Sequence, residues 1–342
     1  MPSERVRLKD IAQQVGVHPS TVSRVLNPAT RDMVSPEVVE KVTATAKAMG
    51  YRPNPLARGL KTQTSGNIGV FVPDLTNPLF PEIVRGAEAV LVEAGLTPIL
   101  ANTKNDHDRK LMLVDHLLQR QIDGIIIITA LRDDPIITAC REYDIPVVIS
   151  DRGVGETEVP GLIIDDQFGM RSVVAHLVQL GHRKMALISG PQHLSASESR
   201  HTSALRAMHE HNIEVDSDLI TFCEDFNPES GRRACRILLD QGKEFTAFIT
   251  ANDHYAMGVN AELYDRKLAC PAEFSVTGYN GIRQTKWLQP SITTVELPKR
   301  EMGMRMAKIM LQRLKDPGGK IERVVIRPTL IERQSTASVR AG

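Results

Sequence analysis

Apolar positions near the start of the chain recur at helical spacing in three short segments. The first segment, residues 8–15, carries one apolar face and ends at Gly16. The second begins near Pro19, because proline is tolerated in the first turn of a helix. The third begins at the serine-proline-glutamate sequence 35–37 and ends at Gly50. Two short helices separated by a glycine turn, with a third to support them, predict an all-α helix-turn-helix unit. The alternative is a small helical cap that binds nothing.

The second of these helices would carry the DNA-reading side chains. In a helix-turn-helix unit it enters the major groove of double-stranded DNA, with its N-terminal side chains on base edges. Its apolar positions Val22, Val25 and Leu26 predict the buried side. Four polar side chains are expected to point away from that side and are DNA-binding candidates: Ser20, Thr21, Ser23 and Arg24.

The remainder of the chain alternates short β-rich runs with helical segments. Strands are predicted at 68–72, 98–101, 124–129, 147–150, 162–164, 185–189, 247–250 and 275–278. Helices are predicted between most of them, for example at 81–94, 109–120, 169–180, 230–241 and 252–266. This alternation predicts an α/β body with parallel sheets and helices on both faces. So many units do not fit one small sheet, and we therefore expect two doubly wound parallel-sheet subdomains.

A polar, turn-rich stretch at 61–67 (KTQTSGN) is typical of a domain boundary. We expect a helix-turn-helix domain over 1–53, a hinge helix and linker over 54–66, and an effector-binding and dimerisation domain over 67–342. Within the last, we expect an N-subdomain over about 67–162 and 294–322 and a C-subdomain over about 163–293 and 323–335.

Charge is distributed unevenly although the net charge is only +1. Residues 1–64 hold ten lysines and arginines against five acidic residues, whereas the rest of the chain holds 32 against 36. A basic head on a mildly acidic body favours contact with a polyanion. The longest apolar run, Ile125 to Ile128, is far too short to span a bilayer. No signal peptide is recognisable, and the four cysteines are scattered, so we expect a cytoplasmic, nucleoid-associated protein.

Polar residues follow several of the predicted strands in the body. They are Asp74, Asp151, Asn252 with Asp253, and Asn280, and Arg200 is expected to open a helix after 189–191. Ligands of doubly wound folds bind beyond the carboxyl ends of the strands, so this set suits a hydroxylated or carboxylated small molecule. Phe80, Tyr255 and Tyr279 are candidates for the walls of the cleft. The alternative is helix N-capping for the aspartates and asparagines and core packing for the aromatic residues.

Motifs of common enzymes are missing from the sequence. It contains no G-x-x-x-x-G-K-[ST] loop, no G-x-S-x-G and no H-E-x-x-H. The ten histidines form no convincing pair of metal ligands on one helix face, and no pair of cysteines has metal-ligand spacing. We therefore expect no enzymatic activity, no catalytic residues, no metal and no cofactor.

Long motifs of the head resemble the LacI/GalR family of bacterial transcription regulators. They are LKDIA at 8–12, VGV at 15–17, STVSRVLN at 20–27, VSPE at 34–37 and GYRPN at 50–54. The resemblance implies that Pro19, Ser20 and Arg24 read the operator. His18 replaces the usual serine cap of the reading helix, and the loop 27–33 is slightly longer than usual, so the operator sequence itself is not implied.

Residues 54–61 are predicted to form a helix of barely two turns after the N-cap candidate Asn54, and Gly59 is expected to weaken it further. Such a segment should fray unless something packs on it. The resemblance implies a hinge helix in which Asn54, Ala57 and Leu60 contact DNA. Leu60 would wedge into the minor groove, and the partner subunit's copy of the helix would order the segment. The alternative is a plain linker.

The resemblance extends through the body, in VPD at 72–74, TNPLF at 76–80, PVVISDR at 146–152, GHRK at 181–184, AND at 251–253 and GYN at 278–280. It implies that a cleft between the subdomains, like that of periplasmic sugar-binding proteins, binds an effector through Asp74, Phe80, Asp151, Arg200, Asn252, Asp253 and Asn280. Asn280 occupies a position that is often aspartate. Leu194 and Ala196 replace an arginine and a threonine of the purine-binding branch, which makes a purine less expected.

Function follows from the fusion of the two parts, since a DNA reader is joined to a sensor. We expect a repressor that binds a pseudo-palindromic operator as a homodimer. A small polar effector, such as a sugar, a sugar derivative or a nucleoside, would control it allosterically. The alternative is a periplasmic-type solute-binding protein without a regulatory role, which would explain the body but not the basic head.

Overall fold

The computed structural model describes residues 6–27, 30–51, 64–104, 106–128, 134–151 and 159–339. The chain divides into two compact units, residues 1–65 and 66–342. The first unit contains α1 (Leu8–Val15), α2 (Pro19–Leu26), the 3₁₀ turn η1 (Arg31–Met33) and α3 (Pro36–Ala48). Gly16 ends α1 with a φ of 76°, the left-handed conformation that favours glycine. The three helices close over a small apolar core formed by Ile11, Ala12, Val22, Val25, Val42 and Ala46.

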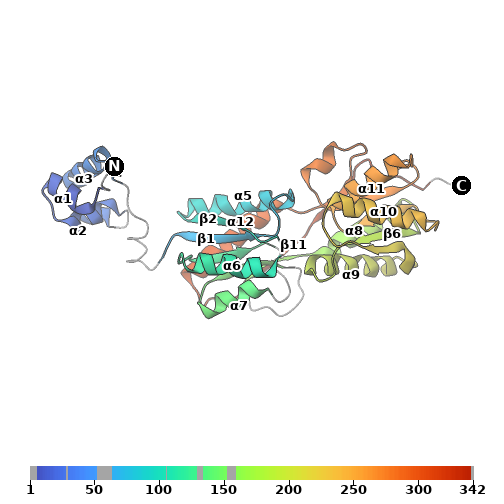
Figure 1. The fold of residues 1–342 in the computed structure, drawn as a ribbon, viewed down its shortest axis with the longest axis horizontal. Coiled ribbons are helices and arrows are strands. Elements are labelled where there is room, and N and C mark those ends of the chain that lie inside the picture. Colours follow the sequence, from blue (N-terminus) through green and yellow to red (C-terminus); the bar gives the residue numbers. More distant parts are fainter. Residues whose placement is uncertain are drawn as a thin grey trace. The chain divides into compact units, whose positions relative to one another are not determined.

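The second unit begins with a six-stranded sheet whose strands all run parallel. In spatial order its strands are β11 (Arg323–Ile326), β5 (Gly161–Ile164), β4 (Val147–Asp151), β3 (Gly124–Ile127), β1 (Asn67–Val72) and β2 (Thr97–Asn102). As Figure 1 shows, α5 (Leu79–Glu93) and α12 (Lys299–Lys315) lie on one side of this sheet, and α6 (His107–Leu118) and α7 (Pro135–Glu142) lie on the other. These elements form the N-subdomain.

The run of four isoleucines shows why the sheet is buried on both faces. Ile126 and Ile128 join the apolar core beneath α5 and α12. Ile125 and Ile127 join the separate core beneath α6 and α7. Successive side chains of a strand point to opposite faces, so a strand covered on both sides needs apolar residues at every position.

A second six-stranded sheet forms the C-subdomain. In spatial order its strands are β12 (Thr329–Ile331), β10 (Thr293–Glu296), β9 (Ser275–Asn280), β8 (Ala247–Thr250), β6 (Met185–Ser189) and β7 (Ile220–Phe222). Only β12 is antiparallel to its neighbour. The helices α8 (Asp166–Gln179) and α9 (Ser195–Glu210) share one apolar core with the sheet, and α10 (Pro228–Asp240) and α11 (Asp253–Asp265) share the other. Two 3₁₀ turns, η2 (Ser217–Leu219) and η3 (Arg283–Trp287), complete it.

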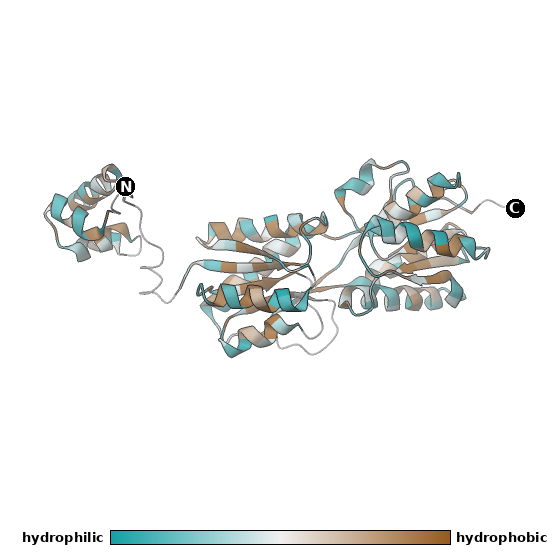
Figure 2. Cartoon of the chain, viewed as in Figure 1, coloured by the Kyte–Doolittle hydropathy of each residue, from teal (hydrophilic) through white to brown (hydrophobic). Residues whose placement is uncertain are grey.

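This arrangement confirms the expected fold class, a helical head and two doubly wound parallel-sheet subdomains. Figure 2 shows hydrophobic residues concentrated on the strands and on the helix faces toward them, with hydrophilic residues outside. The strands β7 and β10 were not predicted from the sequence, and the helices α7 and α12 were not among those named there. Within the part of the chain that the structure describes, no helix has both the length and the apolar character needed to cross a membrane.

Strand pairing places two segments differently from our expectation. We expected 294–322 in the N-subdomain, but Thr294 to Glu296 belong to β10, which pairs with β9 of the C-subdomain. We expected 323–335 in the C-subdomain, but β11 pairs with β5 of the N-subdomain. The segment 323–335 is therefore split between the two sheets, with β11 in the first and β12 in the second. The split falls at Pro328, which lies between β11 and β12 and cannot donate to a strand ladder.

Candidate functional site

The reading helix α2 begins with an unusual but effective cap. His18 has an extended backbone (φ −72°, ψ 145°), and its Nδ1 accepts a hydrogen bond from the backbone N–H of Ser20 at 3.2 Å. Pro19 then occupies the first helical position. The histidine thus satisfies one of the free N–H groups of the first turn, which is the role expected of a serine cap.

The two sides of α2 differ in the way that a DNA-reading helix requires. Val22 and Val25 are fully buried in the core of the first unit. The candidate reading residues face outward to different degrees: Pro19, Ser20 and Arg24 are exposed, whereas Thr21 and Ser23 are half-buried. The following loop is tied back onto the helix, since Arg31 Nε donates to Val25 O at 3.0 Å and Thr30 Oγ1 donates to Arg24 O at 3.0 Å. The exposed side chains of α2 therefore stand on a fixed scaffold.

The three candidates of the hinge helix, Asn54, Ala57 and Leu60, lie outside the described residues. Their role as minor-groove contacts stays a prediction. Asp151 is the last residue of β4 and pairs with Ile163 of β5, but only its backbone lies within the described part of the chain.

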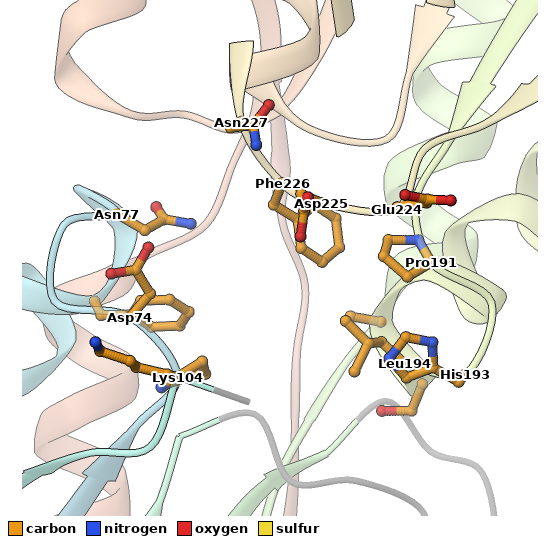
Figure 3. Close-up of a pocket in the computed structure, with 14 residues that line it drawn as sticks. Asp74, Asn77, Lys104, Pro191, His193, Leu194, Glu224, Asp225, Phe226 and Asn227 are labelled. Carbon is orange, nitrogen blue, oxygen red and sulfur yellow. The ribbon is translucent and has the colours of Figure 1, made fainter. Parts of the chain in front are cut away.

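A cavity of about 620 Å³ lies in the second unit, between the carboxyl ends of the two sheets. Figure 3 shows Asp74, Asn77 and Lys104 of the N-subdomain on one side of it, facing residues of the C-subdomain. All of the lining residues come from loops after strands or from the first turns of the following helices: Pro73, Asp74, Asn77, Phe80, Lys104, Pro191, His193, Leu194, Ser195, Ala196, Glu224, Asp225, Phe226 and Asn227. Of the sequence-predicted effector residues, the structure places Asp74 and Phe80 at this cavity.

Local hydrogen bonds hold the polar side chains of the N-subdomain wall. The Asp74 carboxylate accepts from the backbone N–H and from the hydroxyl of Thr76, both at 2.8 Å. Asn77 Oδ1 accepts from the backbone N–H of Leu79 at 3.0 Å, at the start of α5. These bonds orient the two side chains while leaving further acceptor capacity on the carboxylate and the NH₂ group of the amide for a ligand.

Arg200 lies behind the cavity wall rather than in it. It occupies the second turn of α9, which begins at Ser195, so it does not open the helix as we expected. Its side chain is only 3% exposed and donates to Ala251 O at 2.7 Å and to Asn280 Oδ1 at 2.8 Å. The guanidinium also stacks over the ring of Tyr279 at 4.0 Å. It thereby joins α9 to the carboxyl ends of β8 and β9.

Asp166 completes this network from α8. Its Oδ1 lies 3.4 Å from Arg200 Nε and accepts a hydrogen bond from the Tyr279 hydroxyl at 2.7 Å. Both Asp166 and Tyr279 are buried. A buried guanidinium needs such a carboxylate and well-placed acceptors, because an unpaired charge is costly in the interior.

Asn252, Asp253 and Asn280 are also buried and bonded within the protein. Asn252 caps α11 by accepting from the backbone N–H of Tyr255 at 2.9 Å, which is the N-capping role considered as the alternative. Asp253 accepts from the backbone N–H of Ile282 at 2.7 Å and from the Thr294 hydroxyl. Burial raises the pKa of Asp253 to about 7, against the lowering effect of these hydrogen bonds.

The cavity contains polar residues that we did not single out from the sequence, chiefly Lys104, His193, Glu224, Asp225 and Asn227. The rule that ligands bind beyond the carboxyl ends of strands could have identified these residues, but only if every strand had first been located. Asp225 and its neighbours follow β7, whose Ile-Thr-Phe sequence favours a strand but whose three residues are too few to show a period. No cluster of three or more histidine, cysteine or acidic residues suited to a metal ion occurs in the described ranges.

Comparison with known proteins reveals two matching family models. Residues 7–54 match the model of the bacterial regulatory proteins of the lacI family, and residues 174–336 match that of a periplasmic binding protein-like domain. Related proteins align over nearly the whole chain. The HTH-type transcriptional repressor PurR of Serratia proteamaculans is 32% identical over 96% of this chain and 96% of its own. The HTH-type transcriptional regulator RegA of Clostridium saccharobutylicum is 32% identical over 96% of this chain and 98% of its own.

Solved structures agree with these matches. A lac repressor dimer bound to operator and the anti-inducer ONPF shares 27% identity and a TM-score of 0.88, and covers 98% of this chain and 100% of its own. The complex of the transcriptional regulator CelR with cellobiose shares 29% identity and a TM-score of 0.74, and covers 97% of this chain and 100% of its own.

Proposed function

The chain belongs to the LacI/GalR family of bacterial transcription regulators, and from this premise we propose that it represses transcription as a homodimer on a pseudo-palindromic operator, under the control of a small effector. That it is a sequence-specific DNA-binding regulator with a small-molecule effector follows from the family. The observation that carries the proposal is the cavity, because both subdomains contribute to its walls. A ligand that contacts both walls favours one relative position of the two subdomains over others. A sensor requires such a coupling between ligand binding and conformation.

On the DNA side, we assign base readout in the major groove to Pro19, Ser20 and Arg24, with Thr21 and Ser23 beside them. The exposure of the first three on a helix whose other side is buried supports this assignment. Asn54, Ala57 and Leu60 would contact the minor groove, where a leucine wedge kinks the duplex. The solved complex of the related lac repressor dimer with its operator supports the dimeric arrangement.

Selection of operators from random duplexes by the full-length chain tests the DNA side. We expect two half-sites related by a two-fold axis. Arg24→Ala should change which base is preferred at one position of each half-site, because a base-edge contact carries roughly 1–3 kcal/mol of discrimination. A selected sequence without symmetry, or an Arg24→Ala profile identical to that of the wild type, would count against the assignment.

On the effector side, the walls of the cavity suit a ring compound with hydroxyl groups. Phe80 and Phe226 offer aromatic surface, while Asp74, Asp225 and Asn227 offer acceptors and donors at its edge. Such a mixture of aromatic surface and a few polar groups is typical of small-molecule sites. We therefore propose a sugar, a sugar derivative or a nucleoside. The cellobiose complex of CelR and the ribose complex of an Enterococcus faecium regulator, 28% identical with a TM-score of 0.71, support the sugar class.

Asp74, Phe80, Asp151, Arg200, Asn252, Asp253 and Asn280 remain our proposed effector residues. The last four lie next to the carboxyl ends of β8 and β9, where ligands of such sheets bind, although bonds within the protein hold them away from the cavity. Thermal-shift profiling against sugars, sugar acids and nucleosides would identify a ligand. Arg200→Ala should then remove the effect of that ligand on operator binding, with a loss of roughly 2–5 kcal/mol in ligand affinity. Unchanged affinity by calorimetry would give Arg200 a purely structural role.

We further propose that this regulator acts by binding alone, without catalysis, on DNA in the cytoplasm. The family consists of transcription regulators, and the reading helix has a function only where DNA is present. The periplasmic-type solute-binding alternative is not favoured, because it leaves the matched helix-turn-helix domain without a role.

A further inference from the structure

Lys299 connects the two subdomains at one of the three points where the chain crosses between them, which are β5 to α8, β10 to α12 and β11 to β12. It is the first residue of α12, directly after the crossing from β10. Its Nζ donates to three backbone carbonyls: Asn280 O at 3.0 Å, Gly281 O at 2.8 Å and Leu297 O at 3.3 Å. All three donors of the ammonium are therefore used, and the side chain is only 11% exposed. A helix of the N-subdomain thus binds a loop of the C-subdomain through one cation.

The loop that Lys299 binds has an unfavourable backbone conformation that requires stabilising contacts. Asn280 has a φ of 106°, which non-glycine residues rarely adopt, and Gly281 follows with a φ of 63°. A Cβ on Gly281 would come within 2.8 Å of the Glu296 Cα. From the C-subdomain side the loop is held by Arg200, which donates to Asn280 Oδ1, and by Asp253, which accepts from the backbone of Ile282. Lys299 supplies the restraint from the N-subdomain.

The end of α12 that carries Lys299 cannot move independently of the cavity wall. The helices α5 and α12 touch backbone to backbone: a Cβ on Gly86 would lie 2.0 Å from Arg300 O, and a Cβ on Gly303 would lie 1.8 Å from Ile83 O. Such close packing leaves no free space for the two helices to shift relative to one another. Since α5 carries Phe80, which lines the cavity, the position of Lys299 and the position of that wall are coupled.

We propose that Lys299 is the positioning residue that sets the separation of the two cavity walls, by pinning α12 to the Asn280–Gly281 loop. The inference rests on the proposed function of the cavity as the effector site. Asn280 is bonded to Lys299 through its carbonyl and to Arg200 through its side chain. An effector that forms hydrogen bonds with Arg200 or Asn280 would therefore shift the Asn280–Gly281 loop without contacting Lys299 itself. Ligand binding would in this way change the relative position of the subdomains.

The test compares the full-length wild type with Lys299→Met, Lys299→Arg and a control, Lys308→Met. Methionine keeps most of the side-chain volume but removes the three donors, and arginine restores charge and donors. Lys308 is exposed on the same helix. Spin labels at Asp108→Cys and Glu229→Cys, exposed positions in the first turns of α6 and α10, report the separation of the subdomains. Burial raises the pKa of the native thiols to about 11 or 12, so they compete poorly for the label.

With labelled chain diluted in unlabelled chain, we expect Lys299→Met to lengthen the mean label distance by roughly 2 Å or more and to broaden its distribution. Lys299→Arg should restore most of the wild-type distribution, and Lys308→Met should leave it unchanged. Affinity for the selected operator, measured without effector, should shift several-fold in Lys299→Met. A lower melting temperature with unchanged distances and operator affinity would overturn the proposal, as would an equal response of Lys308→Met.

Two further outcomes are informative. Should Lys299→Met fail to fold, Lys299→Gln is the substitute, because glutamine keeps two donors. It should give a distance distribution between those of the wild type and an open state. Wild-type distances in that variant would overturn the proposed role of Lys299. If the label distance depends on Lys299 but no ligand of the cavity is found, the proposed effector site is refuted and the role of Lys299 stands. If a ligand binds the cavity but the label distance does not depend on Lys299, the effector site stands and the role of Lys299 is refuted.

Discussion

Gly278 shows how closely the buried polar network is packed at the level of single residues. A Cβ at this position in β9 would lie 2.2 Å from Asp253 Oδ1, whereas nothing lies within 4 Å of a Cβ at Gly318. We expect Gly278→Ala to lower the free energy of unfolding by roughly 1–3 kcal/mol, because the Asp253 carboxylate must move away from Thr294. Gly318→Ala is the matched control and should change it little. Urea unfolding of both variants measures the difference, and equal stabilities would show that the network yields easily.

Asp253 should make stability depend on pH near neutrality. Its pKa in the folded protein is raised to about 7, so the folded state holds the proton more tightly than the unfolded chain. The stability from this group is therefore complete below the ordinary pKa of a carboxyl group and is lost as the pH rises through about 7. We expect the free energy of unfolding to fall from about pH 4 to about pH 7 and to level off above that, and Asp253→Asn to flatten this part of the profile. Parallel profiles for the two proteins would contradict the pKa shift.

At the scale of elements, the C-terminal tail is held by hydrogen bonds to two buried histidines. His182 Nε2 lies 2.9 Å from Ser275 Oγ and 3.1 Å from Ala337 O, and its Nδ1 lies 2.7 Å from Thr246 Oγ1. His176 Nε2 lies 2.9 Å from the Thr336 hydroxyl. Burial lowers the pKa of both imidazoles, although Glu332 opposes this at His176. Both rings therefore hold the tail in their neutral form.

Acid should release this tail before the domain unfolds. A lowered pKa means that the stabilisation is present above the ordinary pKa of histidine and is lost as the pH falls through the lower, folded-state pKa. We expect hydrogen exchange of the Val276 and Val339 amides, which bond to Ser335 O and Leu180 O, to accelerate more than that of the central strands as the pH falls below about 6. The exchange rates must be corrected for their intrinsic pH dependence. His182→Asn should exchange rapidly already at neutral pH, while a variant of the exposed His209 should behave as the wild type.

At the scale of the whole molecule, the two units should be separable. Each has its own apolar core, and the division falls in the polar stretch 61–67. We expect the fragment 65–342 to stay folded, to dimerise and to bind the same ligand as the full-length chain, but to have no affinity for the operator, because α2 and its basic neighbours are gone. Circular dichroism, calorimetry and gel retardation measure the three properties. Specific retardation of the selected operator by this fragment would show that DNA recognition extends into the body.

Local patterns along the chain determined the parts of this protein in which neighbouring residues decide the outcome. The buried and exposed sides of α2 follow from its 3.6-residue period, and the turn at Gly16 follows from the need for a positive φ. The strand at 124–127 follows from an apolar run that only a doubly covered sheet can bury. Helix caps are equally local, as Asn252 on α11 shows.

Only the tertiary structure decided which of the strand-end residues meet at the cavity. The sequence indicated the correct edge of the sheets for Asp74 and for Arg200, but Arg200 found carboxylate and carbonyl partners from α8, β8 and β9 and turned away from the cavity. The pairing of β11 with β5 and of β12 with β10 is likewise decided by long-range contacts. The pin at Lys299 depends on carbonyls 18 and 19 residues away in the chain, and no local pattern of residues encodes a contact that exists only once both sheets have formed.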